Sequence, residues 1–327
     1  MGFATDVSLD DLIRREEEIF LRRMPKTAEL WERAQRSMPG GVSSSWASSR
    51  PLPVWVSHGE GAYVWDADGT RYADMHGGYG VNVVGHANPA VVRAVQQRVA
   101  RGTHFAQPTE DSIYVAEALA QRFGLPMWRF GNSGTEVTMD AFHLMRAITG
   151  RSLVVKIEGT YHGHHDSAMV SIFRAADQLG PLHDPHRVPG PGVAQEMADL
   201  LRIVPFNDLP ALERVLDQHS GQIAGMIVEP MMMNAGIIPP QPGYLEGVRE
   251  LTRRYGVLLA FDEVKTGLVV DWGGATRLFG VTPDIVCLAK ALGGGFPIGA
   301  CLATTRAATG MVVGVHGSTF GGNPLAM

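Results

Sequence analysis

The sequence predicts an α/β fold built around a mainly parallel sheet. From about residue 88 onward, long helical patterns alternate with short apolar segments, which is typical of strands that helices cover on both faces. Before that point, short strands separated by glycines indicate a smaller antiparallel lobe. We therefore expect two domains, an N-terminal helix and small lobe over residues 1–87 and a large α/β domain over residues 88–327.

The N-terminal region is predicted to be helical up to about residue 38, where Pro39–Gly41 ends the pattern. A serine-rich loop follows over residues 43–49. Short strands are then expected at Val54–Val56 and Ala62–Trp65, and the turn Asp66–Gly69 suits a hairpin. This part of the chain should form the beginning of a small α+β domain.

The large domain is predicted from the alternation of its elements. Helices are expected at Pro89–Arg101, Glu110–Phe123, Thr135–Thr149, Leu209–His219 and Pro242–Tyr255. Strands are expected at Met127–Phe130, Leu153–Ile157, Ile223–Val228, Val257–Phe261 and Ile285–Leu288. Ligands of such sheets bind at the carboxyl ends of the strands, so the residues directly after each strand are the first candidates for a site.

Composition and charge exclude several classes of function. The content of 45% hydrophobic and 19% charged residues is typical of a globular enzyme. The net charge of -5 and the scattered arginines argue against nucleic-acid binding. Cys287 and Cys301 lack the spacing of a zinc site or a disulfide framework, which favours a reducing cytoplasm. Asp10–Phe20 is charged and amphipathic rather than a signal peptide, and no apolar run reaches membrane-spanning length.

Lys290 is the strongest candidate for chemistry. It ends the apolar run that begins at Asp284, and the glycine-rich stretch Ala291–Ala300 follows it. A buried strand would thus deliver one amine to a close-packed bend, as Schiff-base chemistry requires. The alternative is an exposed lysine at a strand end, because lysine is usually a surface residue.

The other three lysines are weaker candidates. Lys26 lies in a charged segment next to Pro25 and is expected to be solvated. Lys156 lies in a predicted strand, where nothing in the sequence indicates a pocket that lowers the pKa of an amine. Lys265 follows an acidic pair too closely to be free of it.

A bend of small residues, Asn132–Thr135, follows the first strand of the large domain and enters the next helix. Its amides and hydroxyls could hold a phosphate at the positive end of the helix dipole, and the alternative is a helix N-cap without a ligand. Asp262 ends the strand Val257–Phe261, where a buried carboxylate needs a cationic partner. A protonated pyridine nitrogen would serve, and an arginine salt bridge is the alternative. Tyr161 could stack on an aromatic cofactor or simply pack in the protein.

His162, His164 and His165 resemble a metal cluster at first sight. No cysteine lies near them and Gly163 interrupts any helical face, so the sequence predicts no metal site. A phosphate cradle, a stacking aromatic ring, a carboxylate for a pyridine nitrogen and an amine for an aldehyde together indicate pyridoxal 5'-phosphate (PLP) as the cofactor. The predicted substrate is a small amine or amino acid.

With these motifs in place, the sequence from about Arg33 to its last residue resembles the class III aminotransferases of fold type I, and within them the glutamate-1-semialdehyde 2,1-aminomutases. The resemblance rests on motifs that occur in order: Pro39–Val42, Gly61–Gly69, Asn132–Glu136, Tyr161–His164, Phe261–Gly267, Leu288–Lys290 and Gly322–Met327. It implies a seven-stranded, mainly parallel sheet covered by helices, PLP-dependent transfer of an amino group, and a homodimer.

The resemblance also implies roles for individual residues. Lys290 would form the internal aldimine with PLP, and Asp262 would pair with the pyridine nitrogen. Tyr161 and Val264 would cover the two faces of the ring, and Thr319 would reach the cofactor phosphate of the neighbouring subunit. The phosphate within the same subunit would be held by Ser133, Gly134 and Thr135. Polar positions near the cofactor are matched by His162, Glu229 and Asn234.

Two departures separate this chain from the aminomutase pattern. An arginine that suits a substrate carboxylate is replaced within the stretch Ser43–Ser49, and a second arginine is missing from Thr266–Val269. The sequence therefore predicts a class III aminotransferase, with the aminomutase as the alternative. Because Met327 falls inside a motif that normally opens a helix, we expect a fragment or truncated gene product without the C-terminal small domain. A catalytically impaired PLP-binding relic is the second alternative.

Overall fold

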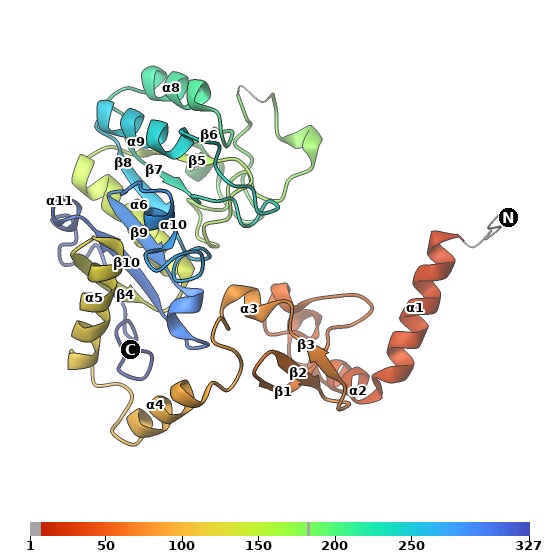
Figure 1. Ribbon diagram of the computed structural model, residues 1–327. Coiled ribbons are helices and arrows are strands. Elements are labelled where there is room, and N and C mark those ends of the chain that lie inside the picture. Colours follow the sequence, from red (N-terminus) through yellow and green to blue (C-terminus); the bar gives the residue numbers. More distant parts are fainter. Residues whose placement is uncertain (1–7, 182–183) are drawn as a thin grey trace. The chain divides into compact units, whose positions relative to one another are not determined.

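The computed structural model describes residues 8–181 and 184–327, which form two compact units. The first unit comprises the chain up to Gly77 together with Val84–Val92, and the second comprises Gly78–Val83 together with Arg93–Met327 (Figure 1). Every predicted site residue belongs to the second unit. The proposed domain boundary near residue 88 stays a prediction.

The first unit combines helices with a small antiparallel sheet of order β1-β2-β3. Its regular elements are α1 (Leu9–Arg23), α2 (Pro25–Ala34), η1 (Pro39–Gly41), η2 (Ser45–Ala47), β1 (Val56–Glu60), β2 (Tyr63–Asp66) and β3 (Arg71–Ala73). The predicted N-terminal helix is broken in two because Pro25 cannot continue α1 and instead begins α2. The hairpin turn forms where expected, since the buried Asp66 carboxylate accepts hydrogen bonds from the backbone N–H groups of Asp68 (3.0 Å) and Thr70 (2.7 Å).

The second unit is built on a seven-stranded sheet of order β4-β10-β9-β8-β7-β5-β6. Its strands are β4 (Met127–Gly131), β5 (Leu153–Ile157), β6 (Leu201–Val204), β7 (Ile223–Val228), β8 (Leu258–Asp262), β9 (Ile285–Leu288) and β10 (Gly299–Ala303). Only β10 runs antiparallel to its neighbours, so the prediction of a mainly parallel sheet is confirmed. Strands β6 and β10 were not predicted from the sequence, because β6 is short and β10 continues directly from a glycine-rich bend.

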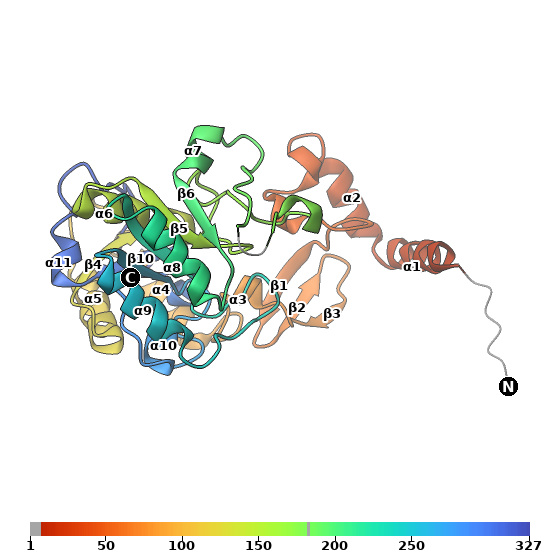
Figure 2. The same ribbon diagram turned by 90° about the horizontal axis from the view of Figure 1, so that it is seen from above.

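Helices cover both faces of this sheet (Figures 1 and 2). One face packs against α5 (Glu110–Phe123), α8 (Leu209–Gln218) and α9 (Tyr244–Arg254), and the other against α6 (Gly134–Thr149), α7 (Gln195–Asp199) and α11 (Thr305–Ala308). Side chains of β8 alternate between the two cores, with Leu259 and Phe261 in the first and Leu258 and Ala260 in the second. This double coverage explains why the central strands are apolar throughout.

The remaining elements are short or connect the two units in sequence: α3 (Gly77–Gly80), α4 (Pro89–Val99), η3 (Ala176–Gln178), α10 (Gly274–Leu278) and η4 (Lys290–Gly293). Helix α6 lies very close to β7, and a Cβ atom at Gly225 would lie 1.9 Å from Met145 Sδ. Within the described residues, none of the helices has both the length and the apolar character needed to span a membrane.

Candidate active site

The predicted strand-end residues collect at one edge of the large sheet. Strands β4, β5, β7, β8 and β9 share one direction, so their carboxyl ends meet at this edge. Polar or charged residues directly follow three of them, namely Asn132, Glu158 and Glu229, and Asp262 is the final residue of β8. Lys290 follows β9 by two positions.

Asp262 and His162 form a buried pair at the centre of this edge. His162 Nδ1 lies 2.7 Å from Asp262 Oδ2, and Val264 N–H donates to Asp262 Oδ1 at 3.0 Å. The side chain of His162 is completely buried, and that of Asp262 is 6% exposed. Among the described residues, no lysine or arginine forms an ion pair with Asp262. The alternative for Asp262, a salt bridge with an arginine, is therefore not found among the described residues.

Lys290 lies within electrostatic range of Asp262 and Glu229. Burial lowers the pKa of Lys290, and the charges of Asp262 and Glu229 oppose that shift while Lys265 reinforces it. The backbone of Lys290 is in the left-handed region, with φ of 47°. Such a conformation is unfavourable for a residue with a Cβ and is characteristic of functional positions, because surrounding packing must impose it.

The N-terminus of α6 lies against the residues that flank Asp262 and Lys290. Ser133 caps this helix, and its Oγ accepts a hydrogen bond from Glu136 N at 3.2 Å. A Cβ atom at Gly134 would lie 3.2 Å from Val264 Cγ1 and 3.8 Å from Ala289 Cβ. In the described part of the chain, the N–H groups of Gly134 and Thr135 donate no hydrogen bond, as is usual in the first turn of a helix. They remain available for an anion.

The loop after β5 brings Tyr161 and Glu229 together. Glu229 Oε1 accepts hydrogen bonds from Tyr161 N at 3.1 Å and Asn234 Nδ2 at 3.0 Å, and Oε2 accepts one from Met233 N at 2.9 Å. The Tyr161 ring packs on Phe173 with 6.1 Å between the ring centres and 28° between the planes. The sequence-predicted residues Tyr161, Glu229 and Asn234 therefore belong to one connected group.

The other two histidines of this loop point to different partners. His164 Nδ1 lies 3.1 Å from Thr135 Oγ1, so it contacts the start of α6. His165 packs edge-on against Phe142, and burial lowers its pKa to about 3. Gly163 fits between them because a Cβ atom there would lie 2.7 Å from Thr135 Cα. The three histidines thus stabilise different contacts of the loop.

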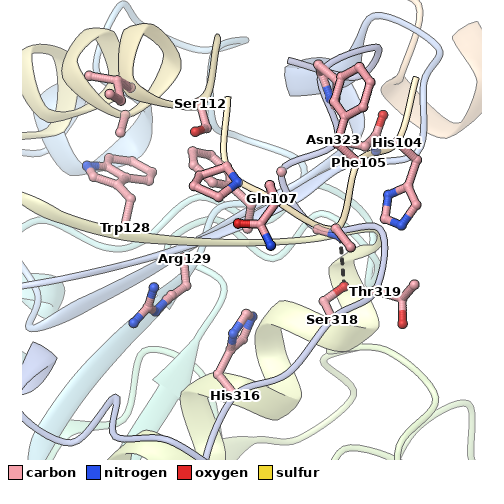
Figure 3. Close-up of a pocket in the computed structure, with 18 of the residues that line it drawn as sticks. His104, Phe105, Gln107, Ser112, Trp128, Arg129, His316, Ser318, Thr319 and Asn323 are labelled. Atoms are coloured by element: carbon pink, nitrogen blue, oxygen red, sulfur yellow. Dashed lines mark hydrogen bonds between the residues drawn. The ribbon is translucent and has the colours of Figure 1, made fainter. Parts of the chain in front are cut away.

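Thr319 is exposed and lines an open pocket of about 590 Å³ in the second unit (Figure 3). Trp128 and Arg129 of β4 line the same pocket, as does His316. Ser318, next to Thr319, accepts a hydrogen bond from Asn132 Nδ2 at 2.9 Å. The segment that carries Thr319 is therefore anchored beside the loop that enters α6.

The sequence of the chain is similar to a known family and to named proteins. Residues 45–327 match the family "Aminotransferase class-III". The chain belongs to the class III aminotransferases. It is 41% identical over 316 residues to a glutamate-1-semialdehyde 2,1-aminomutase of Heliobacterium modesticaldum. The aligned region covers 94% of this chain and 70% of the relative.

Solved structures of class III aminotransferase relatives share the fold. An omega-transaminase from Sphaerobacter thermophilus matches with a TM-score of 0.87 and 38% identity, over 92% of this chain and 70% of that one. A glutamate-1-semialdehyde aminomutase from Pseudomonas aeruginosa in complex with PMP matches with a TM-score of 0.87 and 33% identity, over 97% of this chain and 72% of that one. These matches confirm the predicted fold type I and PLP as the cofactor.

The chain's own residues fit this class III cofactor. Asp262 is a buried carboxylate without a lysine or arginine ion pair among the described residues, which suits a protonated pyridine nitrogen. The unpaired N–H groups of Gly134 and Thr135 suit a phosphate. Lys290 supplies an amine whose pKa is lowered by burial, which suits a bond to an aldehyde.

The prediction for Lys156 is wrong, and the buried Glu263 was not predicted from the sequence. Lys156 is fully buried, and burial lowers its pKa to about 7, so the expectation that it has no such pocket fails. The available signal was a lysine within five consecutive strand residues that are otherwise apolar. Glu263 is also fully buried and accepts four hydrogen bonds from Thr266, Ala275 and Thr276. No local pattern in the sequence reveals these donors, because Ala275 and Thr276 come from the next helix, α10.

Proposed function

We propose that this class III enzyme transfers an amino group with Lys290 as the residue that binds PLP. The observation that supports this proposal best is that Lys290, Asp262 and the start of α6 lie at one edge of the sheet. Gly134 of α6 packs near Val264 and Ala289, which flank Asp262 and Lys290, and Lys290 interacts electrostatically with Asp262. Lys290 would hold the cofactor covalently through its Nζ atom.

Bound PLP supplies an electron sink that stabilises a carbanion at the substrate carbon. Once an incoming amine has displaced it, the Lys290 amine is free to act as general base and then as general acid. Its pKa, lowered by burial, leaves more of the amine neutral near pH 7 than an exposed lysine would have. Lys290 can therefore take a proton from the substrate and return it at another carbon.

Asp262 would keep the ring nitrogen protonated. Its carboxylate is held in place by Val264 N–H and by His162 Nδ1, which makes it a fixed negative charge that need not reorganise during the reaction. His162 would thus support Asp262 rather than contact the substrate. The proton on His162 is assigned to Nδ1, because that atom faces a carboxylate oxygen.

Most of the other predicted site residues would contact the ring or the phosphate of the cofactor. Tyr161 and Val264 would cover the two faces of the ring. The phosphate would lie at the start of α6, held by Ser133, Gly134 and Thr135. Glu229 and Asn234, which hydrogen-bond to each other, would act near the cofactor through the loop that carries Tyr161.

A homodimer is part of the proposal. Thr319 is exposed and its neighbour Ser318 is anchored to Asn132, so the Thr319 hydroxyl is free to reach the cofactor phosphate of a partner subunit. The cytoplasm is the proposed compartment, and the two buried free cysteines, Cys287 and Cys301, are compatible with its reducing conditions.

The proposed substrate is a small amine or amino acid, with amino transfer between two substrates. The aminomutase reaction on glutamate-1-semialdehyde is the second candidate, favoured by the 41% identity to a protein of that name. An aminotransferase and an aminomutase differ in the substrates that they require, because an aminomutase converts a single substrate and needs no separate amino acceptor. Turnover of glutamate-1-semialdehyde alone, compared with turnover of amines in the presence of a keto acid, separates them.

The test of the proposed function is covalent trapping of PLP. The protein with added PLP is expected to show a visible absorption band, and borohydride reduction should leave the cofactor attached to Lys290. Lys290→Ala should abolish both, whereas the same change at the exposed Lys26 should preserve both. A colourless protein with unmodified Lys290 after reduction would overturn the proposal. A protein that binds PLP but transfers no amino group would instead support the relic.

A further inference from the structure

The peptide group that joins Thr160 to Tyr161 lies between two buried charged side chains. Lys156 Nζ donates to Thr160 O at 3.1 Å, and Tyr161 N donates to Glu229 Oε1 at 3.1 Å. The carbonyl and the N–H of one peptide group therefore each face an ionisable group. The ammonium faces the negative end of the peptide dipole, and the carboxylate faces its positive end.

Lys156 is buried, and among the described residues its Nζ contacts carbonyl oxygens rather than a carboxylate. Its Nζ donates two further hydrogen bonds, to Ala168 O at 3.3 Å and to Val170 O at 2.6 Å. An ammonium has three donors, so these three carbonyls satisfy it completely. All three carbonyls belong to the loop between residues 160 and 170, and Lys156 therefore joins the beginning of this loop to its end.

A lysine is unusual at this position because Lys156 is fully buried and its amine is desolvated. It lies on β5 between Ile203 of β6 and Ile227 of β7, on the face that packs against α6. Burial lowers the pKa of Lys156 to about 7, and the charges of Glu229 and Glu158 oppose that shift. An apolar residue would fill such a site at lower desolvation cost, and the three hydrogen bonds that Lys156 Nζ donates offset part of that cost.

Glu229 is occupied by the chain itself. Its two oxygens accept three hydrogen bonds, from Tyr161 N, Asn234 Nδ2 and Met233 N. A carboxylate with these partners is suited to fixing the loop. The loop in turn carries Tyr161 and, one residue later, His162, which contacts Asp262.

We infer that Lys156 and Glu229 are positioning residues that fix the Thr160–Tyr161 peptide from its two ends and thereby orient Tyr161 and His162 toward the PLP site. The effect of these two residues on the reaction is then indirect. The inference rests on the proposed function only for the roles of Tyr161 and His162, because the peptide and its two charged neighbours are features of the chain alone.

Hydrogen exchange followed by mass spectrometry tests this inference on the protein without added PLP. In Lys156→Met, which keeps an unbranched side chain one heavy atom shorter and removes its donors, the amides of the loop from residue 160 to residue 170 should exchange about tenfold faster or more. Amides of α6 should change little. Lys26→Met is the matched control, since it makes the same chemical change at an exposed position.

Glu229→Leu, which removes both acceptor oxygens, should give a similar increase in the same loop. Because both side chains hold one peptide, Lys156→Met combined with Glu229→Leu should exchange little faster than the more affected single variant. Rates in the double variant equal to the product of the two separate increases would overturn the inference. Equal acceleration in the loop and in α6 would also overturn it, since that outcome indicates a general loss of stability.

The pKa of Lys156 provides a second measurement that does not depend on the Met variant folding. The chain has four lysines, so ¹³C NMR of labelled lysine side chains resolves each one. Glu229→Gln should lower the pKa of Lys156, because the carboxylate that raises it is removed. An unchanged pKa would contradict the electrostatic link through the peptide. A negative result in the exchange or pKa experiments would not change the trapping of PLP on Lys290. A negative trapping result would likewise not change the exchange rates, so the two proposals can be distinguished.

Discussion

Glu263 should be a major source of stability for the second unit. Its Oε2 accepts from Ala275 N (2.5 Å) and Thr266 Oγ1 (3.0 Å), and its Oε1 accepts from Thr276 N (2.7 Å) and Thr276 Oγ1 (2.6 Å). Each oxygen therefore faces one backbone N–H and one hydroxyl. Burial raises the pKa of Glu263, and the hydrogen bonds from Thr276, Ala275 and Thr266 oppose that rise.

The cost of removing this carboxylate can be worked out from those contacts. In Glu263→Gln, either orientation of the amide places its NH₂ group against one hydroxyl and one N–H. The hydroxyl can rotate to accept, but the N–H loses its acceptor, which costs about 2 kcal/mol for a buried group. In Glu263→Ala both N–H groups lose their acceptors and a cavity forms, so the cost should reach about 5 kcal/mol.

Thermal unfolding followed by circular dichroism measures these differences. For a unit of this size, the expected decreases in Tm are about 4–8 °C for Gln and about 10–20 °C for Ala. Glu250→Gln is the matched control, because the Glu250 side chain is 73% exposed and its ion pair with Arg254 should contribute little. A Gln variant as stable as the native protein, or an Ala variant no less stable than Gln, would refute this reasoning.

Three further predictions concern the site, the core and the first unit. Asp262→Asn should lower the rate of amino transfer on the order of 10²- to 10³-fold by removing a buried fixed charge, which steady-state kinetics would measure, and a loss below tenfold would contradict the role of Asp262. Gly225→Ala should destabilise the protein by about 1–3 kcal/mol in urea unfolding because its Cβ would lie 1.9 Å from Met145 Sδ, whereas Gly317→Ala, with nothing within 4 Å, should be nearly neutral. The hydrogen bond from His86 lowers the pKa of Asp74 below its unfolded value of about 3.9, so the stability that Asp74 contributes is present above that pH and lost as pH falls through the folded pKa. Asp74→Asn should therefore reduce the pH dependence of unfolding of the first unit below about pH 4, and parallel pH curves for the two proteins would argue against it.

Local pattern was enough to predict most of the large sheet. Strands such as Ile223–Val228 are buried on both faces, so their apolar runs are continuous and easy to recognise. Helix α5 begins at Glu110 and ends at Phe123, as predicted, because Gly124 in the left-handed conformation stops it. Strand β10 was missed because its small residues, Gly299–Ala303, extend a glycine-rich bend and carry no strand pattern of their own.

The order of residues along the chain was enough to predict the α/β class and the polar residues at the strand ends, since both depend on local pattern. It also made Lys290 the candidate amine, because Lys290 follows a predicted apolar strand. The packed structure was needed to show that Lys156 is buried, that Glu263 accepts hydrogen bonds from α10, and that the Thr160–Tyr161 peptide lies between Lys156 and Glu229. These contacts join residues on different elements, and the burial and charge that give them their energy exist only once the elements have packed.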